Sequence, residues 1–274
     1  MRPPFHALTI VAAVATALAV APPAAAEPAW APADQAAIAP GSATFTEGGQ
    51  CTSNFVFHDS AGDVYLGQAA HCAGTGGPAA TNGCESDSLP LGTQVEVEGA
   101  QEPGTLVYSS WLAMQAHGET DPAACEFNDF ALVRLSPLDA ARVNPTIPFW
   151  GGPTSLGADS RAGEKVLSYG DSSLRLGLTA LSPKEGHSLG QSAGGWTHTV
   201  LTVTPGIPGD SGSAVVDGSG RALGVVSTLQ MLPVPGSNGV SDLARAVGYM
   251  EATGGPQVEL ALGTEGFRGP LLPF

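Results

Sequence analysis

The sequence predicts an all-β fold, and two observations carry that prediction. Short apolar runs alternate with clusters of Gly, Asp, Ser and Pro along most of the 274 residues, as is typical of antiparallel strands joined by turns. A sustained helical period is missing before the C-terminal fifth of the chain. With 43% hydrophobic residues, the chain can bury one or two substantial cores.

The N-terminus has the pattern of a secretory signal. Arg2 precedes an apolar run over residues 7–20, and Ala24, Ala25 and Ala26 provide small residues for cleavage. The run is shorter than the roughly 20 residues that a spanning helix needs. We expect residues 1–26 to be a signal peptide and a short segment, 27–45, to follow it; a retained anchor is the alternative.

Strands are expected in order at residues 54–58, 64–70, 130–135, 165–169, 197–204, 213–216 and 222–227. Turn residues 217–220, Asp-Gly-Ser-Gly, join the last two strands into a hairpin. A stretch rich in Pro and Gly, 136–163, is expected to link two halves of the molecule.

One helix is expected near the C-terminus. Asp242 can cap it, and Leu243, Val247 and Met250 then fall on one face. Alternating residues 257–262 look like a further strand, and a tail rich in Pro and Gly follows.

Two short motifs and one aspartate suggest nucleophilic catalysis. Ala-Ala-His-Cys covers residues 69–72, Gly-Asp-Ser-Gly-Ser covers residues 209–213, and Asp129 precedes an apolar run. A serine hydroxyl needs an imidazole as base, and the imidazole needs an acid that fixes its tautomer. Taken singly, each residue has a structural explanation: a buried histidine, an aspartate that caps a turn, a turn serine. The set His71, Asp129 and Ser211 therefore carries the prediction.

A second serine lies in a G-x-S-x-G sequence, Gly190 to Gly194, as in the nucleophile elbow of α/β-hydrolases. That fold needs an acid and then a histidine after the serine. Only His198 follows Ser192, with no acid between them. We expect Ser192 to lie in a Gly-rich loop.

Four cysteines, Cys51, Cys72, Cys84 and Cys125, follow the predicted signal. An even number in an exported chain favours two disulfides, for which three pairings are possible. A metal site is the rival interpretation, but no C-x-x-C pair occurs. No metal and no cofactor are expected.

The chain order His71, Asp129, Ser211 and all three local motifs resemble the trypsin/chymotrypsin-like serine proteases, in particular secreted actinobacterial members. The resemblance covers roughly residues 45–250. It implies two six-stranded antiparallel β-barrels, residues 46–140 with His71 and Asp129 and residues 141–274 with Ser211, the C-terminal helix and the tail. It also implies the disulfides Cys51–Cys72 and, by exclusion, Cys84–Cys125.

The resemblance implies a role for each residue of the site. Ser211 attacks a peptide carbonyl, His71 transfers the proton, and Asp129 orients the ring. Gly209 and Gly212 allow a tight turn, so that the amides of Gly209 and Ser211 form the oxyanion hole. Ser227 matches the serine that binds the aspartate. Residues Ser227, Thr228 and Leu229 match the edge that pairs with substrate.

Specificity depends on the pocket. Pro205 occupies the position of the pocket-base acid of trypsin, so cleavage after Arg or Lys is not expected, and Leu229 can narrow the pocket. A small or medium apolar residue before the cleaved bond is predicted. Asp210 needs a cationic partner, and an arginine such as Arg161 is one candidate.

The expected function is that of a secreted, extracellular serine endopeptidase, a monomer acting on protein or peptide substrates. A net charge of −15 disfavours partners such as nucleic acid and anionic membranes. A catalytically silent binding module on the same fold, and an esterase that uses the same three residues, are the alternatives.

Overall fold

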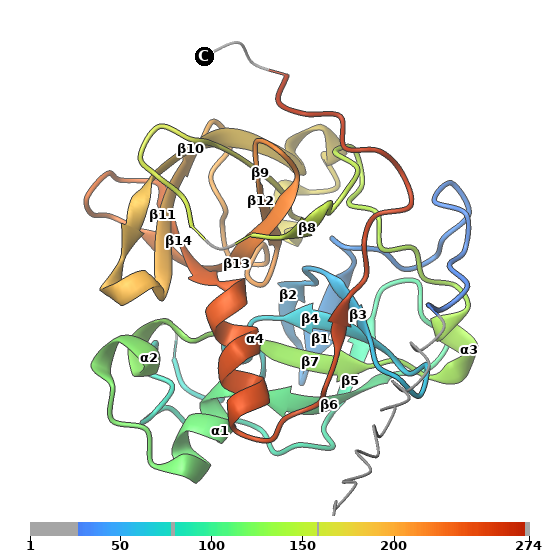
Figure 1. Ribbon diagram of the computed structural model, residues 1–274, viewed down its shortest axis with the longest axis horizontal. Coiled ribbons are helices and arrows are strands. Elements are labelled where there is room, and N and C mark those ends of the chain that lie inside the picture. The colour runs from blue at the N-terminus through green and yellow to red at the C-terminus, as the bar shows by residue number, and fades with distance from the viewer. Residues whose placement is uncertain (1–26, 78–79, 158, 272–274) are drawn as a thin grey trace, which may run out of the picture.

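The computed structural model describes residues 27–77, 80–157 and 159–271. The predicted signal peptide, 1–26, lies outside the described residues. Two β-structures lie one above the other, and a helix runs from the lower edge of the upper one down the front of the lower one (Figure 1). In the part of the chain that the structure describes, no helix is long and apolar enough to cross a membrane.

The N-terminal sheet has eight strands in the order β15-β3-β4-β7-β6-β5-β1-β2. They are β1 (Ala43–Thr46), β2 (Gly49–Thr52), β3 (Val56–His58), β4 (Val64–Gln68), β5 (Gln94–Val97), β6 (Gly104–Ser109), β7 (Ala131–Arg134) and β15 (Glu259–Leu260). Every pairing is antiparallel. This half-barrel encloses an apolar core that includes Leu66, Leu106 and Val133.

The C-terminal strands are β8 (Ser155–Leu156), β9 (Lys165–Tyr169), β10 (Pro183–Ser192), β11 (Thr197–Thr202), β12 (Ala214–Asp217), β13 (Arg221–Gln230) and β14 (Ser237–Asp242). Six of them close into a barrel because β12 pairs with both β9 and β13, and β8 adds to β13 in parallel. Valines such as Val166, Val215 and Val240 fill its centre. The prediction of an all-β, two-barrel fold is confirmed, although among the described residues only this second barrel closes by strand pairing.

Four α-helices lie around the sheets: α1 (Ser110–His117), α2 (Pro122–Phe127), α3 (Pro137–Ala140) and α4 (Leu243–Ala252). Four 3₁₀ turns complete the described elements: η1 (Ala70–Ala73), η2 (Ser173–Arg175), η3 (Thr179–Leu181) and η4 (Ala193–Gly195). Helix α4 is the predicted C-terminal helix; the Asp242 carboxylate accepts a hydrogen bond from the Arg245 amide at its start.

Several predicted bounds need correction. The strand expected over 64–70 ends at Gln68, because residues 70–73 turn into η1. The expected linker 136–163 contains α3 and β8, and the strand expected over 257–262 pairs only at Glu259 and Leu260. Helices α1 and α2 were not expected. Both are too short to show a helical period. The sequence does contain one signal for α2, an aspartate at the N-cap followed by Pro122 at the first helical position.

A third apolar cluster lies between the two β-structures. It joins Phe57 and Phe130 of the first to Leu167 and Val216 of the second, with Met250 of α4. This packing fixes the position of one half relative to the other. The loops at the edge of this contact carry the candidate site.

Candidate active site

His71 lies in η1, directly after β4. Its backbone amide donates to Asp129 Oδ1 at 2.9 Å, and its Nδ1 lies 2.7 Å from Asp129 Oδ2. The two bonds fix both the backbone and the ring, and the side chain remains 27% exposed. With Nδ1 engaged by the carboxylate, Nε2 is the nitrogen available to a reacting group.

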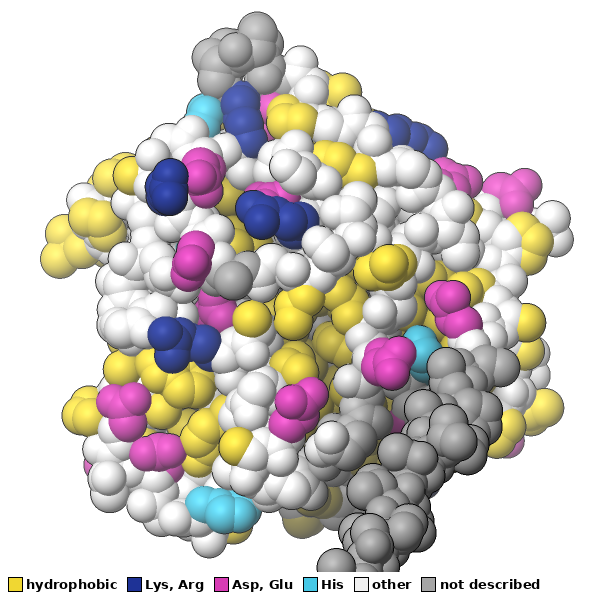
Figure 2. All heavy atoms as spheres, viewed as in Figure 1, with side chains coloured by type: hydrophobic (Ala, Val, Ile, Leu, Met, Phe, Trp, Pro, Cys, Tyr) yellow, Lys and Arg dark blue, Asp and Glu magenta, His cyan; other side chains and the backbone are white. Residues whose placement is uncertain are grey.

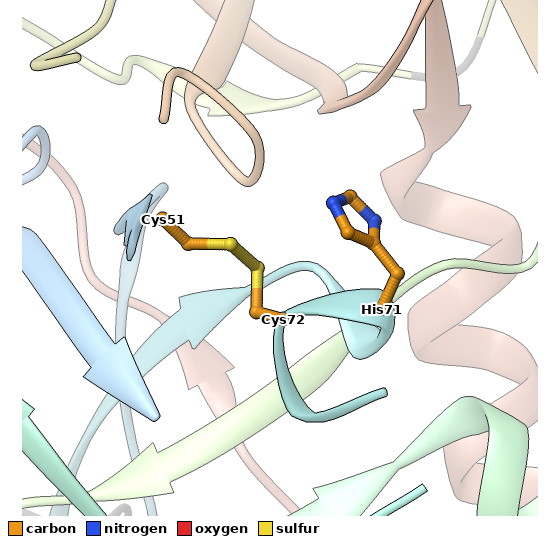
Figure 3. A group of neighbouring side chains, drawn as sticks. All are labelled: Cys51, His71 and Cys72. Atoms are coloured by element: carbon orange, nitrogen blue, oxygen red, sulfur yellow. A yellow bond between two sulfur atoms is a disulfide. The ribbon is translucent and has the colours of Figure 1, made fainter. Parts of the chain in front are cut away.

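A disulfide supports this turn. Cys51 of β2 is bonded to Cys72 of η1, and the His71 ring projects on the other side of the turn (Figure 3). The two sulfurs and the ring nitrogen are close enough to suggest a metal site. However, zinc is bound by thiolates, and these sulfurs are bonded to each other. The second disulfide joins Cys84 to Cys125; both pairings are those that the resemblance implies.

Asp129 lies between α2 and β7 and is 3% exposed. Its amide donates to Ser241 Oγ at 3.1 Å, and Ser227 Oγ donates to its Oδ2 at 2.5 Å. Burial alone would raise the pKa of Asp129, but the charge and hydrogen bonds of His71, with Ser227, hold that pKa below its usual value. The carboxylate is therefore ionised at neutral pH.

The same pair sets the charge of the histidine. Burial opposes protonation of His71, but the charge of Asp129 and its hydrogen bond outweigh burial, so the pKa of His71 is raised above its ordinary value. The ring therefore has a stronger affinity for a proton than an exposed imidazole has.

Ser211 lies in the loop between β11 and β12, in the wall of a cleft that His71 and Asp129 also line. The loop turns at Gly209 (φ 95°) and Gly212 (φ 90°), where residues with side chains are strained. A Cβ on Gly212 would also lie 2.4 Å from the Thr52 carbonyl. Among the described residues, no hydrogen bond joins the Ser211 hydroxyl to His71, and neither the Gly209 nor the Ser211 amide has an acceptor.

Asp210, beside Ser211, is fully buried and holds the loop from behind. Its Oδ2 lies 2.7 Å from Arg175 Nη2 and 3.4 Å from Lys184 Nζ. These cations replace the predicted candidate Arg161, whose amide instead bonds Glu164 on the surface. Burial lowers the pKa of Lys184 to about 8 against the opposing effect of Asp210.

The cleft wall contains three of the four residues predicted for substrate binding, Ser227, Thr228 and Leu229. Pro205 is not part of that wall. Its carbonyl accepts a hydrogen bond from Arg175 at 2.8 Å, and the next residues, Gly206 and Ile207, line the cleft instead.

Ser192 ends β10 in an antiparallel hairpin with β11, which is not a strand-turn-helix elbow. His198 lies elsewhere, fully buried, with its ring nitrogens 2.8 Å from Ser160 Oγ and from Asp242 Oδ2. Sequence reasoning missed this network because its members come from three distant segments.

Neither a family model nor a curated protein matches the chain. Solved structures do. A protease from Thermobifida fusca, protease A, is 18% identical and has a TM-score of 0.52 over 82% of this chain and all of its own. A glutamic-acid-specific serine protease, which uses a histidine triad in substrate binding, is also 18% identical, with a TM-score of 0.50 over 82% of this chain and all of its own. The chain therefore has the two-barrel fold of the chymotrypsin-like serine proteases.

Proposed function

We propose that this protein is a serine endopeptidase in which Ser211, His71 and Asp129 form the catalytic triad. One observation carries the proposal: a chain of hydrogen bonds from Ser227 through Asp129 to His71, in a cleft that Ser211 shares. His71 accepts the proton of the Ser211 hydroxyl through Nε2, and Asp129 stabilises the imidazolium that forms. His71 then gives this proton to the leaving amine as the peptide bond breaks, which forms the acyl-enzyme on Ser211. The neutral ring next activates a water molecule that hydrolyses the acyl-enzyme.

The oxyanion hole is assigned to the amides of Gly209 and Ser211. Both lack an acceptor among the described residues, and both residues line the cleft. An unpaired amide is available to the negative oxygen of a tetrahedral intermediate. Each such donor contributes about 3 to 4 kcal/mol to the transition state of acyl transfer.

The specificity pocket is assigned to the space between residues 206–208 and 227–229. The side chain of Asn238 crosses it: Oδ1 accepts from the Gly206 amide at 2.8 Å, and Nδ2 donates to the carbonyls of Gly206 and Thr228 at 3.0 and 3.2 Å. No acidic side chain belongs to these two described segments. A shallow, uncharged pocket fits a small apolar residue before the cleaved bond and excludes Arg and Lys.

A peptide library varied at that residue tests the pocket. We expect Ala to give a kcat/KM at least tenfold above Phe, because Phe is too large for a pocket that Asn238 crosses, and a misfit of even one methylene costs about 1 to 3 kcal/mol. Asn238→Ala should raise the kcat/KM for Leu and Phe relative to Ala. A preference for Phe in the unmodified protein would contradict the shallow pocket.

We also propose that the protein is secreted. Two observations support this proposal: the signal-peptide pattern of residues 1–26 and the two disulfides.

We further propose that the protein is a monomer without nucleic-acid or membrane partners. On the face shown in Figure 2, the few Lys and Arg side chains lie apart from one another, most of them in the upper half, so they make no continuous basic stripe there. We propose the same boundary between the two barrels as the sequence predicts, with residues 46–140 in the first and residues 141–274 in the second.

The first test is labelling of the secreted protein with a fluorophosphonate, followed by peptide mapping. We expect one adduct, on Ser211, in a chain that begins near Glu27. Ser211→Ala should abolish labelling and lower peptide turnover by about 10⁶-fold. Ser192→Ala, which changes an exposed serine at the end of β10 and not in the expected loop, should leave both unchanged.

The missing hydrogen bond between Ser211 and His71 supports one second candidate, a binding module that does not cut. Folded protein without an adduct would point to that binding module or to an inactive zymogen. An adduct with ester but no peptide turnover would indicate an esterase.

A further inference from the structure

The two amides of the proposed oxyanion hole are each held from behind by a serine hydroxyl. A peptide group is planar and trans, so its carbonyl and its N–H point in opposite directions. Whatever binds the carbonyl therefore sets the direction of the amide. The carbonyls that matter here are those of Pro208, joined to Gly209, and of Asp210, joined to Ser211.

Ser172 binds the first carbonyl. Its Oγ lies 2.5 Å from the Pro208 oxygen, and the side chain is buried, with 3% of the residue exposed. The Gly209 N–H consequently points away from Ser172. No other described residue donates to the Pro208 carbonyl, so this orientation depends on one hydroxyl.

The hydroxyl itself is well anchored. Ser172 Oγ accepts from the Leu174 amide at 3.2 Å, and the Ser172 amide donates to Asp210 Oδ1 at 3.1 Å. The neighbouring Arg175 binds the same aspartate. Ser172 therefore belongs to a loop that is fastened to the Asp210 carboxylate on both sides.

The second carbonyl has two donors. Ser213 Oγ lies 2.5 Å from the Asp210 oxygen, and the Ser213 amide lies 3.1 Å from it. The orientation of the Ser211 amide is thus held twice. The Gly209 amide is more easily reoriented, because the Pro208 carbonyl has a single donor among the described residues and Gly209, at φ 95°, has no side chain that restricts rotation.

We infer that Ser172 is a positioning residue that fixes the Gly209 amide in the oxyanion hole, and that Ser213 does the same, redundantly, for the Ser211 amide. This inference rests on the proposed function for its effect on catalysis. Its structural part, the orientation of one peptide group, is independent of catalysis.

The kinetic test compares four variants on one ester substrate. Ser172→Ala should lower kcat by at least tenfold, up to the 10²- to 10³-fold that loss of one oxyanion donor costs, with KM and the pH profile unchanged. Ser213→Ala should have a smaller effect, because the Ser213 amide still holds the carbonyl. Ser172→Thr keeps the hydroxyl and should recover most of the rate. Ser173→Ala, next to Ser172 and exposed, is the matched control.

The structural test uses the unliganded protein. Crystal structures of the unmodified chain and of Ser172→Ala should differ at the Pro208–Gly209 peptide, with its carbonyl turned away from position 172 in the variant. A variant that keeps both the peptide orientation and kcat overturns the inference. If the unmodified protein fails to react at Ser211, the proposed function fails, and the crystal structures still decide the inference about Ser172.

Discussion

At the scale of single residues, the charge of Asp129 governs the charge of His71. The raised pKa of His71 is the net result of burial, which lowers it, and of Asp129, which raises it more. The ring acts as a base only when neutral, so activity should fall as pH decreases through this raised pKa. We expect the acid limb of kcat/KM to lie above the ordinary histidine value of about 6.5.

Asp129→Asn removes the charge and leaves the burial. The pKa of His71 should then fall, so the acid limb moves to lower pH, and the plateau should drop by about 10⁴-fold because the amide no longer holds the correct tautomer. A pH–rate profile of purified protein measures both. Asp63→Asn, which removes a carboxylate of an exposed ion pair, should leave the profile in place. An acid limb that stays fixed in Asp129→Asn would show that this carboxylate does not set the charge of the ring.

The sequence identifies the residues of the candidate triad, but it does not identify the side chains that position the loop around Ser211. His71, Asp129 and Ser211 were identifiable because each has a characteristic local sequence. The partner of Asp210 was not, since Arg175 lies 35 residues away and reaches it through a loop without a motif. Ser172 and Asn238 were missed for the same reason: a serine or asparagine beside turn residues is ordinary, and only the fold shows which carbonyl it binds.

At the scale of elements, the two disulfides differ in how much they stabilise the fold and in how close they lie to the candidate site. Cys84–Cys125 fastens α2 to the loop before β5 and has a sequence separation of 41. Cys51–Cys72 spans 21 positions and adjoins His71. The longer loop restricts the unfolded chain more, but only the shorter one lies in the cleft wall.

We therefore expect that removing Cys84–Cys125 lowers stability more, and that removing Cys51–Cys72 lowers activity more. Replacing Cys84 and Cys125 by Ala should lower the free energy of unfolding by about 4 kcal/mol with kcat unchanged. Replacing Cys51 and Cys72 should cost about 3 kcal/mol and also lower kcat, because η1 loses its anchor. Denaturant unfolding and initial rates at a temperature where both variants are folded measure the two effects. An equal loss of kcat in both variants would contradict the expectation that Cys51–Cys72 alone of the two supports activity.

Prediction of elements succeeded where a pattern was local. The hairpin β12–β13 was predicted from its turn residues, and α4 from its cap and apolar face. The strand β10 was not, because Pro183–Ser192 is polar and half-buried, and its place in the barrel depends on pairing with β9 and β11. Helix α1 buries only Ser110, Trp111 and Met114 of its eight residues, too few to show a helical period.

At the scale of the whole molecule, the C-terminal segment straps the two halves together. After α4 the chain pairs as β15 with β3, and then returns to the second half (Figure 1). There the amides of Gly263 and Arg268 donate to the carbonyls of Pro153 and Trp150. The proposed triad is divided between the halves, since His71 and Asp129 lie in the first and Ser211 in the second.

Removing residues 257–274 should therefore lower both Tm and kcat/KM, since the strap and the apolar contacts of Leu260 and Phe267 with the cluster between the halves are lost. Differential scanning calorimetry and ester turnover give the two readouts. Leu262→Ala changes an exposed side chain in the same segment and should change neither. An unchanged kcat/KM in the longer truncation would show that the halves hold their positions without the strap.

The burial of Lys184 gives the protein an internal chemical reporter. The chain has two lysines, Lys165 and Lys184, and the Lys184 side chain is 2% exposed behind Asp210. Burial lowers the pKa of this amine to about 8 and keeps acylating reagents from it while the barrel is closed. An opened molecule exposes an ordinary lysine amine, which such reagents modify at alkaline pH. Acylation of Lys184 therefore proceeds only through opened molecules, and its rate under gentle conditions measures how often the C-terminal barrel opens.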